Sequence, residues 1–121
     1  MLFRSHVPPP LATRPDNLTY TETAPNGEEY TLEFNRLGGR IPTFLISPWV
    51  SKGFVEQKGT NYQGKTMSYS ASSTLRTLGY LWGFAPFTPR VEDSASWEHL
   101  IQTTLRNDTP SALPNPVAFS R

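Results

Sequence analysis

The stretch FNRLGGRIPTFLISPWV, residues 34–50, carries the clearest sign of a folded core. Its three consecutive apolar residues, Phe44 to Ile46, are bracketed by Pro42 and Pro48. A short continuous apolar run favours a strand that is buried on both faces, as in a parallel sheet with helices on both sides. Proline cannot donate a hydrogen bond to a neighbouring strand, so Pro48 ends the run. We therefore expect one buried core strand within Ile41–Val50 and an α/β fold.

The segments on either side of this run predict a hairpin and a loop. Apolar residues alternate with polar ones over residues 30–34, and threonines alternate over residues 19–23. The Asn26-Gly27 pair between them readily takes the positive φ angles of a tight turn. We expect a β-hairpin with one buried face. Residues 52–66 contain three glycines and no periodicity, which predicts a surface loop.

Two helices are expected further along the chain. Ser68 or Ser70 can cap the first, over residues 70–82, and Gly83 can end it. Asp93 or Ser94 can cap the second. Apolar side chains recur at helical spacing in both, which predicts that Trp82 and Trp97 pack in the core. The expected apolar faces are Ala71, Leu75, Leu78 and Trp82 in the first helix and Trp97, Leu100, Ile101 and Leu105 in the second.

Composition limits the class of protein. The chain has 121 residues, of which 36% are hydrophobic, enough for one small core. Its net charge is +1 with both signs mixed along the chain, which argues against a nucleic-acid partner. It has no cysteine, so disulfides and thiolate metal sites are excluded. Neither a signal peptide nor an apolar run of about 20 residues is recognisable, and localisation is left open.

Four stretches resemble one known family, in the same order. Residues 34–50 resemble the R-L-G-x-R-[VI]-P-x-x-x-I-S-P segment of the phosphoesterase family that holds non-specific phospholipases C and related acid phosphatases. His6 to Pro10 resembles its D-H-V-P-x-P element, and Phe87 to Arg90 its L-T-x-R-D element. Asn107 to Pro116 resembles its closing D-C-P-x-x-L-P-x-P. The resemblance extends from about Phe3 to Pro116.

The resemblance implies a fold and an activity for a longer parent protein. The chain would be the C-terminal part of an alkaline-phosphatase-like fold, with residues 1–116 in the phosphoesterase domain and 117–121 as a disordered tail. The parent would hydrolyse phosphate esters, including phospholipids, with a divalent metal, and it could be secreted. The family's acidic metal-binding motif and its nucleophile belong to an N-terminal half that would precede Met1. We therefore expect a partial phosphoesterase that holds no cofactor and is inactive by itself.

A second departure from the family lies at the start of the first helix. Residues 69–73 read Tyr-Ser-Ala-Ser-Ser where relatives usually read Y-E-H-S-S or Y-D-H-T-S. Ser70 and Ala71 thus stand in place of an acidic residue and a histidine. Alanine can neither transfer a proton nor bind a metal. Ser72 and Ser73 have no base beside them, so we expect helix-start hydrogen bonds from them rather than nucleophilic chemistry.

The candidate site residues each have a structural alternative. His6 is the catalytic candidate, against a solvated histidine beside three prolines. Arg36 and Arg40 could hold a phosphate by forked hydrogen bonds, or they could pair with Glu33 or backbone carbonyls. Further substrate-binding candidates are Trp49, which follows the core strand, and Tyr69 of the altered motif. We expect His99 at the surface and no metal site in this chain, since its two histidines lack an acidic cluster.

Two other interpretations stay open at this point. The chain could be a stand-alone, non-catalytic module that binds a partner or a membrane surface through the aromatic link Tyr80–Phe87. It could also be an active subunit whose other half lies on a separate chain.

Overall fold

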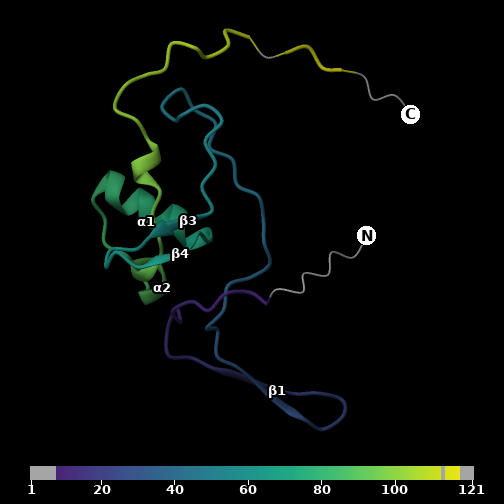
Figure 1. The fold of residues 1–121 in the computed structure, drawn as a ribbon. Coiled ribbons are helices and arrows are strands. Elements are labelled where there is room, and N and C mark those ends of the chain that lie inside the picture. Colours follow the sequence, from purple (N-terminus) through teal and green to yellow (C-terminus); the bar gives the residue numbers. More distant parts are fainter. Residues whose placement is uncertain (1–7, 113, 118–121) are drawn as a thin grey trace.

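The structure is a computed structural model that describes residues 8–112 and 114–117. It is a small α/β fold with two separate two-stranded antiparallel sheets (Figure 1), which confirms the predicted class. His6, the catalytic candidate, lies outside the described residues. The elements are the strands β1 (Tyr20–Thr23), β2 (Glu29–Leu32), β3 (Lys58–Thr60) and β4 (Thr66–Ser68), the helices α1 (Ala71–Trp82) and α2 (Pro89–Asp93), and the 3-10 helix η1 (Glu98–Leu100).

The predicted hairpin is confirmed, but its buried face is not. Strands β1 and β2 pair antiparallel, with Tyr20 opposite Leu32 and Thr23 opposite Glu29. Gly27 closes the turn at a φ of 84°, and its N–H donates to the carbonyl of Ala24. Every residue of both strands is exposed, because no other described element packs against the hairpin. The prediction of one buried face was therefore wrong.

A second hairpin, β3–β4, lies partly within the stretch predicted to be loop. Lys58 pairs with Ser68, and Asn61 organises the turn. The Asn61 Oδ1 accepts hydrogen bonds from the backbone N–H groups of Gln63 and Lys65, at 3.0 and 2.9 Å. Strands of three residues are too short to show an alternating pattern, so periodicity missed them.

Helix α1 begins and ends where the sequence predicts. The N–H of Ser70 donates to the Ser73 Oγ at 3.0 Å, so Ser73 forms the expected helix-start bond. Gly83 ends the helix in the left-handed conformation, with its N–H bonded to the carbonyl of Gly79 at 2.8 Å. A left-handed residue at this position is the common way for a helix to stop.

The buried face of α1 is not the predicted apolar one. Ser73, Thr77 and Gly79 are its buried residues, whereas Leu75 is 39% and Trp82 73% exposed. The Thr77 Oγ1 accepts the backbone N–H of Trp97 at 3.0 Å and donates to the carbonyl of Ser73. Small side chains allow this close approach between the helix and the segment after α2. The prediction that Trp82 packs in the core was wrong, and Trp97 is half-buried.

The predicted second helix is wrong: residues 94–105 form only the 3-10 helix η1, and the short helix α2 ends at Asp93, where the predicted helix was to begin. Helix α2 is capped by Thr88, whose Oγ1 accepts the N–H of Val91, and it ends at Ser94 in extended conformation. Ser94, Ala95 and Ser96 are then buried in irregular backbone before η1. The helix prediction failed because these small residues meet α1 where a helix cap was expected.

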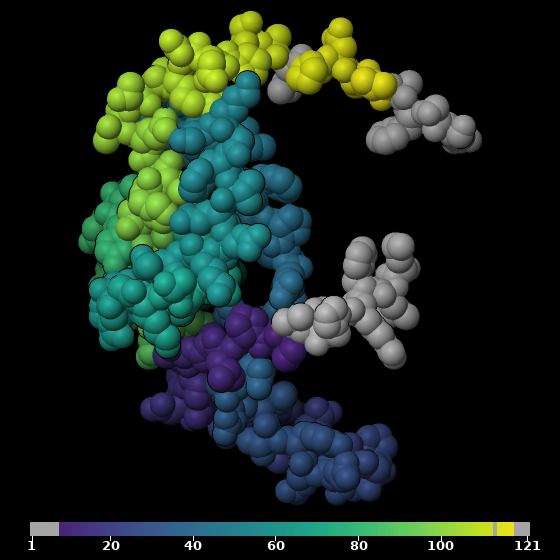
Figure 2. Space-filling model, in the orientation of Figure 1, coloured from purple at the N-terminus to yellow at the C-terminus, as the bar shows by residue number. Residues whose placement is uncertain are grey.

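The predicted core strand is the largest correction. Residues 41–49 contain no strand, and Val50 forms only an isolated antiparallel bridge with Ile101. Phe44 is 79% and Ile46 93% exposed. In Figure 1 this part of the chain is the extended blue trace between β2 and β3, and Figure 2 shows it as a thin arm beside the main body. The described chain offers no sheet that could bury it.

The described core instead lies between α1, α2 and the residues that follow α2. Its buried apolar residues are Val91 and Ala95. Beyond η1, residues 102–112 and 114–117 form no helix or strand. Among the helices of the described residues, none has the length and apolar character to cross a bilayer.

Candidate functional site

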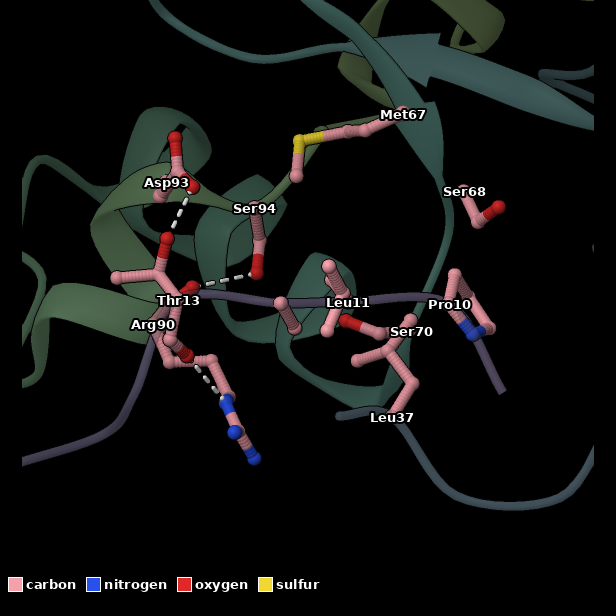
Figure 3. A pocket seen from close by; sticks show the side chains of 11 residues that line it. Pro10, Leu11, Thr13, Leu37, Met67, Ser68, Ser70, Arg90, Asp93 and Ser94 are labelled. Carbon is pink, nitrogen blue, oxygen red and sulfur yellow. Dashed lines mark hydrogen bonds between the residues drawn. The ribbon is translucent and has the colours of Figure 1, made fainter. Parts of the chain in front are cut away.

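A small cavity lies where the N-terminal segment crosses the body of the fold (Figure 3). Its volume is about 30 Å³, enough for roughly one water molecule. Residues 10–13, β4, the cap of α1 and helix α2 all contribute to its wall. The side chains that line it include Leu11, Thr13, Met67, Ser70, Arg90 and Asp93.

Asp93 joins three distant parts of the chain at this cavity. One carboxylate oxygen accepts the hydroxyl of Thr13, as Figure 3 shows. The other accepts the Nδ2 of Asn61 at 2.6 Å. Asn61 is only 6% exposed and also holds the β3–β4 turn. The Asp93 carboxylate therefore ties the N-terminal segment and the second hairpin to α2.

Arg90 donates hydrogen bonds to backbone carbonyls at the same junction, where Thr13 and Asn61 meet α2. Its Nε donates to the carbonyl of Thr13 at 2.8 Å, and its Nη2 donates to the carbonyl of Phe34. The Ser94 hydroxyl donates to the carbonyl of Arg90 at 2.6 Å. The arginine of the L-T-x-R-like stretch thus fixes the chain that enters and leaves the first hairpin.

A second polar cluster lies between β3, β4 and η1. The Tyr69 hydroxyl donates to the Glu56 Oε2 at 2.8 Å. The His99 Nε2 lies 3.0 and 3.2 Å from the two oxygens of the same carboxylate. His99 is exposed as expected, but its partner was not foreseen. Burial raises the pKa of Tyr69, and the hydrogen bond to Glu56 and the charges of Glu56 and Glu98 raise it further.

The raised pKa of Tyr69 predicts a stability change in alkaline solution. The folded chain holds the phenolic proton more tightly than the unfolded chain, in which tyrosine has its ordinary pKa of about 10. The contribution of Tyr69 is therefore complete below about pH 10 and is lost as the pH rises above it. We expect urea unfolding midpoints to fall more between pH 9 and 11 in the wild type than in Tyr69→Phe.

The matched control for this measurement is Tyr62→Phe, which leaves the bond between Tyr69 and Glu56 intact. It should follow the wild type across the same pH interval. Equal pH dependence in the wild type and Tyr69→Phe would contradict the assignment.

The structure does not gather the predicted substrate-binding residues into one site. Arg36 donates to the carbonyl of Pro9 at 3.0 Å, and Arg40 is exposed. Trp49 is 43% exposed, and its carbonyl accepts the N–H of Gln102. Tyr69 belongs to the cluster with Glu56 and His99. None of these four lines the cavity described above.

The residues that sequence reasoning missed are Asp93, Asn61 and Glu56. The sequence pattern indicated Asp93 only as a possible helix cap and Arg90 only as part of a motif. The hydrogen-bond partners of Asp93 lie 32 and 80 positions away in the sequence, and the two carbonyls that accept from the Arg90 side chain lie 56 and 77 positions away, so no local spacing could reveal them. Ser70, from the altered motif, does line the cavity beside Arg90 and Asp93.

A divalent metal site needs several donor side chains close together. Across residues 8–112 and 114–117, no three His, Cys, Asp or Glu side chains come together. Glu56 and His99 form a pair of such side chains, with the His99 Nε2 3.0 Å from the Glu56 Oε2. The described residues do not fit the metal site that a phosphoesterase requires, and we derive no step through a metal.

Comparison with known proteins agrees with the family that the sequence motifs resemble. The sequence model of the Phosphoesterase family matches residues 3–85. Non-specific phospholipase C5 of Arabidopsis thaliana is 36% identical over 117 residues, which cover 95% of this chain and 22% of that protein. Non-specific phospholipase C4 of the same plant is 31% identical over 120 residues, covering 95% of this chain and 21% of that protein. The chain thus spans about a fifth of the length of these relatives.

Proposed function

Because the chain belongs to the phosphoesterase family, as its four motif-like stretches predicted, we propose that it works as part of a hydrolase that cleaves phosphate ester bonds. The observation that carries this proposal is the 36% identity to a non-specific phospholipase C along 95% of the chain. The substrate class is a phosphate ester with a lipid or a comparable alcohol as the leaving group. The chain forms the C-terminal part of an alkaline-phosphatase-like domain in this proposal.

Within that enzyme, we assign this chain a supporting role and no catalysis of its own. Hydrolysis of a phosphate ester needs groups that neutralise the charge developing on the phosphoryl oxygens. At the cavity, the Arg90 guanidinium donates to two backbone carbonyls, and the Asp93 carboxylate accepts from Thr13 and Asn61. Ala71 stands where relatives usually carry a histidine. These features support a role in holding neighbouring segments of the polypeptide in place rather than in binding the substrate.

One observation favours a second candidate, a non-catalytic binding module. Leu81 and Trp82, at the end of α1, are 47% and 73% exposed, and Phe87, in the link between α1 and α2, is 63% exposed. Exposed apolar residues gathered in one place mark interaction surfaces. On this alternative, the Tyr80–Phe87 segment would contact a partner while the phosphoesterase fold serves only as a scaffold.

The first test is an activity measurement on the isolated chain and on a hybrid. In the hybrid, the aligned segment of Arabidopsis non-specific phospholipase C5 is replaced by this chain. We expect no turnover of a chromogenic choline phosphodiester by the isolated chain with any added divalent metal. The hybrid should be slower than the parent phospholipase by on the order of a hundredfold, the usual effect of losing one acid–base group.

Restoring the altered motif should recover activity in the hybrid. Ser70→Glu combined with Ala71→His returns the acidic residue and the histidine to the start of α1. The matched control is Thr74→His, which adds a histidine at an exposed position of the same helix. Recovery in the double variant but not in the control is the expected result. Metal-dependent turnover by the isolated chain, or a folded double variant without recovery, would contradict the proposal.

A further inference from the structure

Two short stretches of the chain fit the acceptor pattern for N-linked glycans. In this pattern an asparagine is followed by any residue except proline and then by serine or threonine. The two stretches are Asn17-Leu18-Thr19 and Asn107-Asp108-Thr109. Because the pattern is short, it arises often by chance and by itself selects neither asparagine. The structure, however, gives the two asparagines different surroundings.

Asn17 lies in a bend just before strand β1, in a part of the chain that is open to solvent. Residues 16–20 are all exposed, and Leu18 is 70% exposed. The Asp16 Oδ1 accepts the N–H of Leu18 at 2.9 Å, and the Arg14 Nη2 donates to the carbonyl of Leu18 at 2.8 Å. These bonds hold the backbone of the bend, and no other described residue forms a hydrogen bond with the side chain of Asn17 or Thr19. Figure 2 shows this part of the chain and the first hairpin at the lower edge of the molecule.

These features match what attachment of an N-linked glycan requires. The transferring enzyme engages the asparagine amide and the hydroxyl two residues later, so both groups must be free and the backbone between them must bend. The glycan is bulky and hydrophilic, and it stays on the folded protein, so the asparagine must remain at the surface. Asn17 and Thr19 meet both conditions.

The stretch at Asn107 meets them less well. The Arg106 Nε lies 3.1 Å from the Asp108 Oδ1, so the middle residue of this pattern is held in an ion pair. Thr109 is followed by Pro110. A proline restricts the residue before it to extended backbone, which opposes the bend that would bring the threonine hydroxyl towards the asparagine amide.

We propose that Asn17 is an N-glycosylation site of this protein and that Asn107 is not. In the transfer, the Asn17 Nδ2 forms a bond to the anomeric carbon of an oligosaccharide carried on a polyprenyl diphosphate in the endoplasmic reticulum. The bond between that carbon and the diphosphate oxygen breaks, the diphosphate leaves with the electron pair, and Nδ2 releases one proton. The hydrophilic glycan then lies beside Leu18 and Tyr20, which are 70% and 54% exposed, and shields them from other apolar surfaces.

Expression of the full chain behind a cleavable secretion leader, in yeast or animal cells, tests the site. Most of the chain carries one glycan, which an amidase specific for N-glycans removes. Asn17→Gln and Thr19→Val abolish the glycan, whereas Thr19→Ser keeps it because the hydroxyl remains. Asn107→Gln is the matched control and leaves the glycan in place. Whole-cell material is scored together with the medium, so a variant that fails to fold still reports whether its glycan was attached.

The unfolding midpoint in urea gives a second readout, in which each glycosylated chain is compared with the same chain from a bacterial host that attaches no glycan. A glycan on Asn17 leaves the midpoint unchanged, because this side chain is exposed. The contrasting variant is Gln63→Thr in the Asn17→Gln background, which creates the acceptor pattern at Asn61. Asn61 is only 6% exposed, and its Nδ2 donates to the Asp93 carboxylate. A glycan on that nitrogen displaces the bond and lowers the midpoint.

Three results would overturn the inference. The first is a chain that enters the secretory pathway and carries no glycan. The second is a glycan on Asn107. The third is a glycan on Asn17 that lowers the unfolding midpoint as much as one on Asn61. None of these measurements depends on hydrolysis of a phosphate ester, so failure here would leave the proposed function intact.

Discussion

Replacing Asp93 with alanine is expected to lower the free energy of unfolding by about 2–4 kcal/mol, since hydrogen bonds to a charged group contribute roughly 1.5–3 kcal/mol each. The carboxylate accepts from the Thr13 hydroxyl and from the Asn61 Nδ2. Its removal leaves the amide of Asn61 buried without that partner, and Asn61 is only 6% exposed. Urea titration followed by tryptophan fluorescence measures the change, which is a large part of a small domain's stability.

The neighbouring residue provides the control for Asp93. Glu92→Ala removes an exposed carboxylate from the same short helix. It should change the free energy of unfolding by less than about 0.5 kcal/mol, as is usual for surface substitutions. If the two variants are equally stable, then Asp93 does not join the N-terminal segment and the second hairpin to α2 as described.

Replacing Thr77 with valine is expected to cost about 1–3 kcal/mol, the usual penalty for a buried donor that loses its acceptor. Thr77 is fully buried, and its Oγ1 accepts the backbone N–H of Trp97 at 3.0 Å. Valine has nearly the same shape but no oxygen, so that N–H is left unpaired beside α1. The unfolding midpoint in urea should fall while the far-ultraviolet circular dichroism of the helix is kept.

The control for Thr77 lies on the exposed side of the same helix. Thr74→Val makes the same chemical change at an exposed position. Threonine and valine have nearly equal helix propensities, and this variant removes no acceptor from a buried N–H. Equal stability of the two valine variants would mean that the bond to Trp97 contributes nothing.

The sequence predicted where helix α1 begins and ends, but not which of its faces is buried. The ends of α1 depend on Ser70 and Gly83, which act on the turn beside them, so local patterns were sufficient. The choice of buried face depends on what packs against the helix. Thr77 accepts the backbone N–H of Trp97, and Gly79 lies against Phe84, so these two residues are buried instead of Leu75 and Trp82.

The core strand shows a different reason for failure. The apolar run at Phe44 to Ile46 predicts a buried strand, but burial requires a second surface. No such surface exists within the described residues, so the run is exposed. The family was predictable because it depends on the order of motifs alone. The polar junction at Asp93 was not predictable, because it joins residues 32 and 80 positions apart.

The first hairpin has a practical consequence for protein engineering. Its eight strand residues are all exposed, and its ladder is supplemented by the hydroxyls of Thr21 and Thr31, 3.1 Å apart. The tip at Asn26 and Gly27 therefore has no tertiary neighbour to displace. Exposed tips of this kind accept inserted sequence with little disturbance. An epitope or a fluorescent label placed there would report on this chain inside a larger assembly without touching the junction around α2.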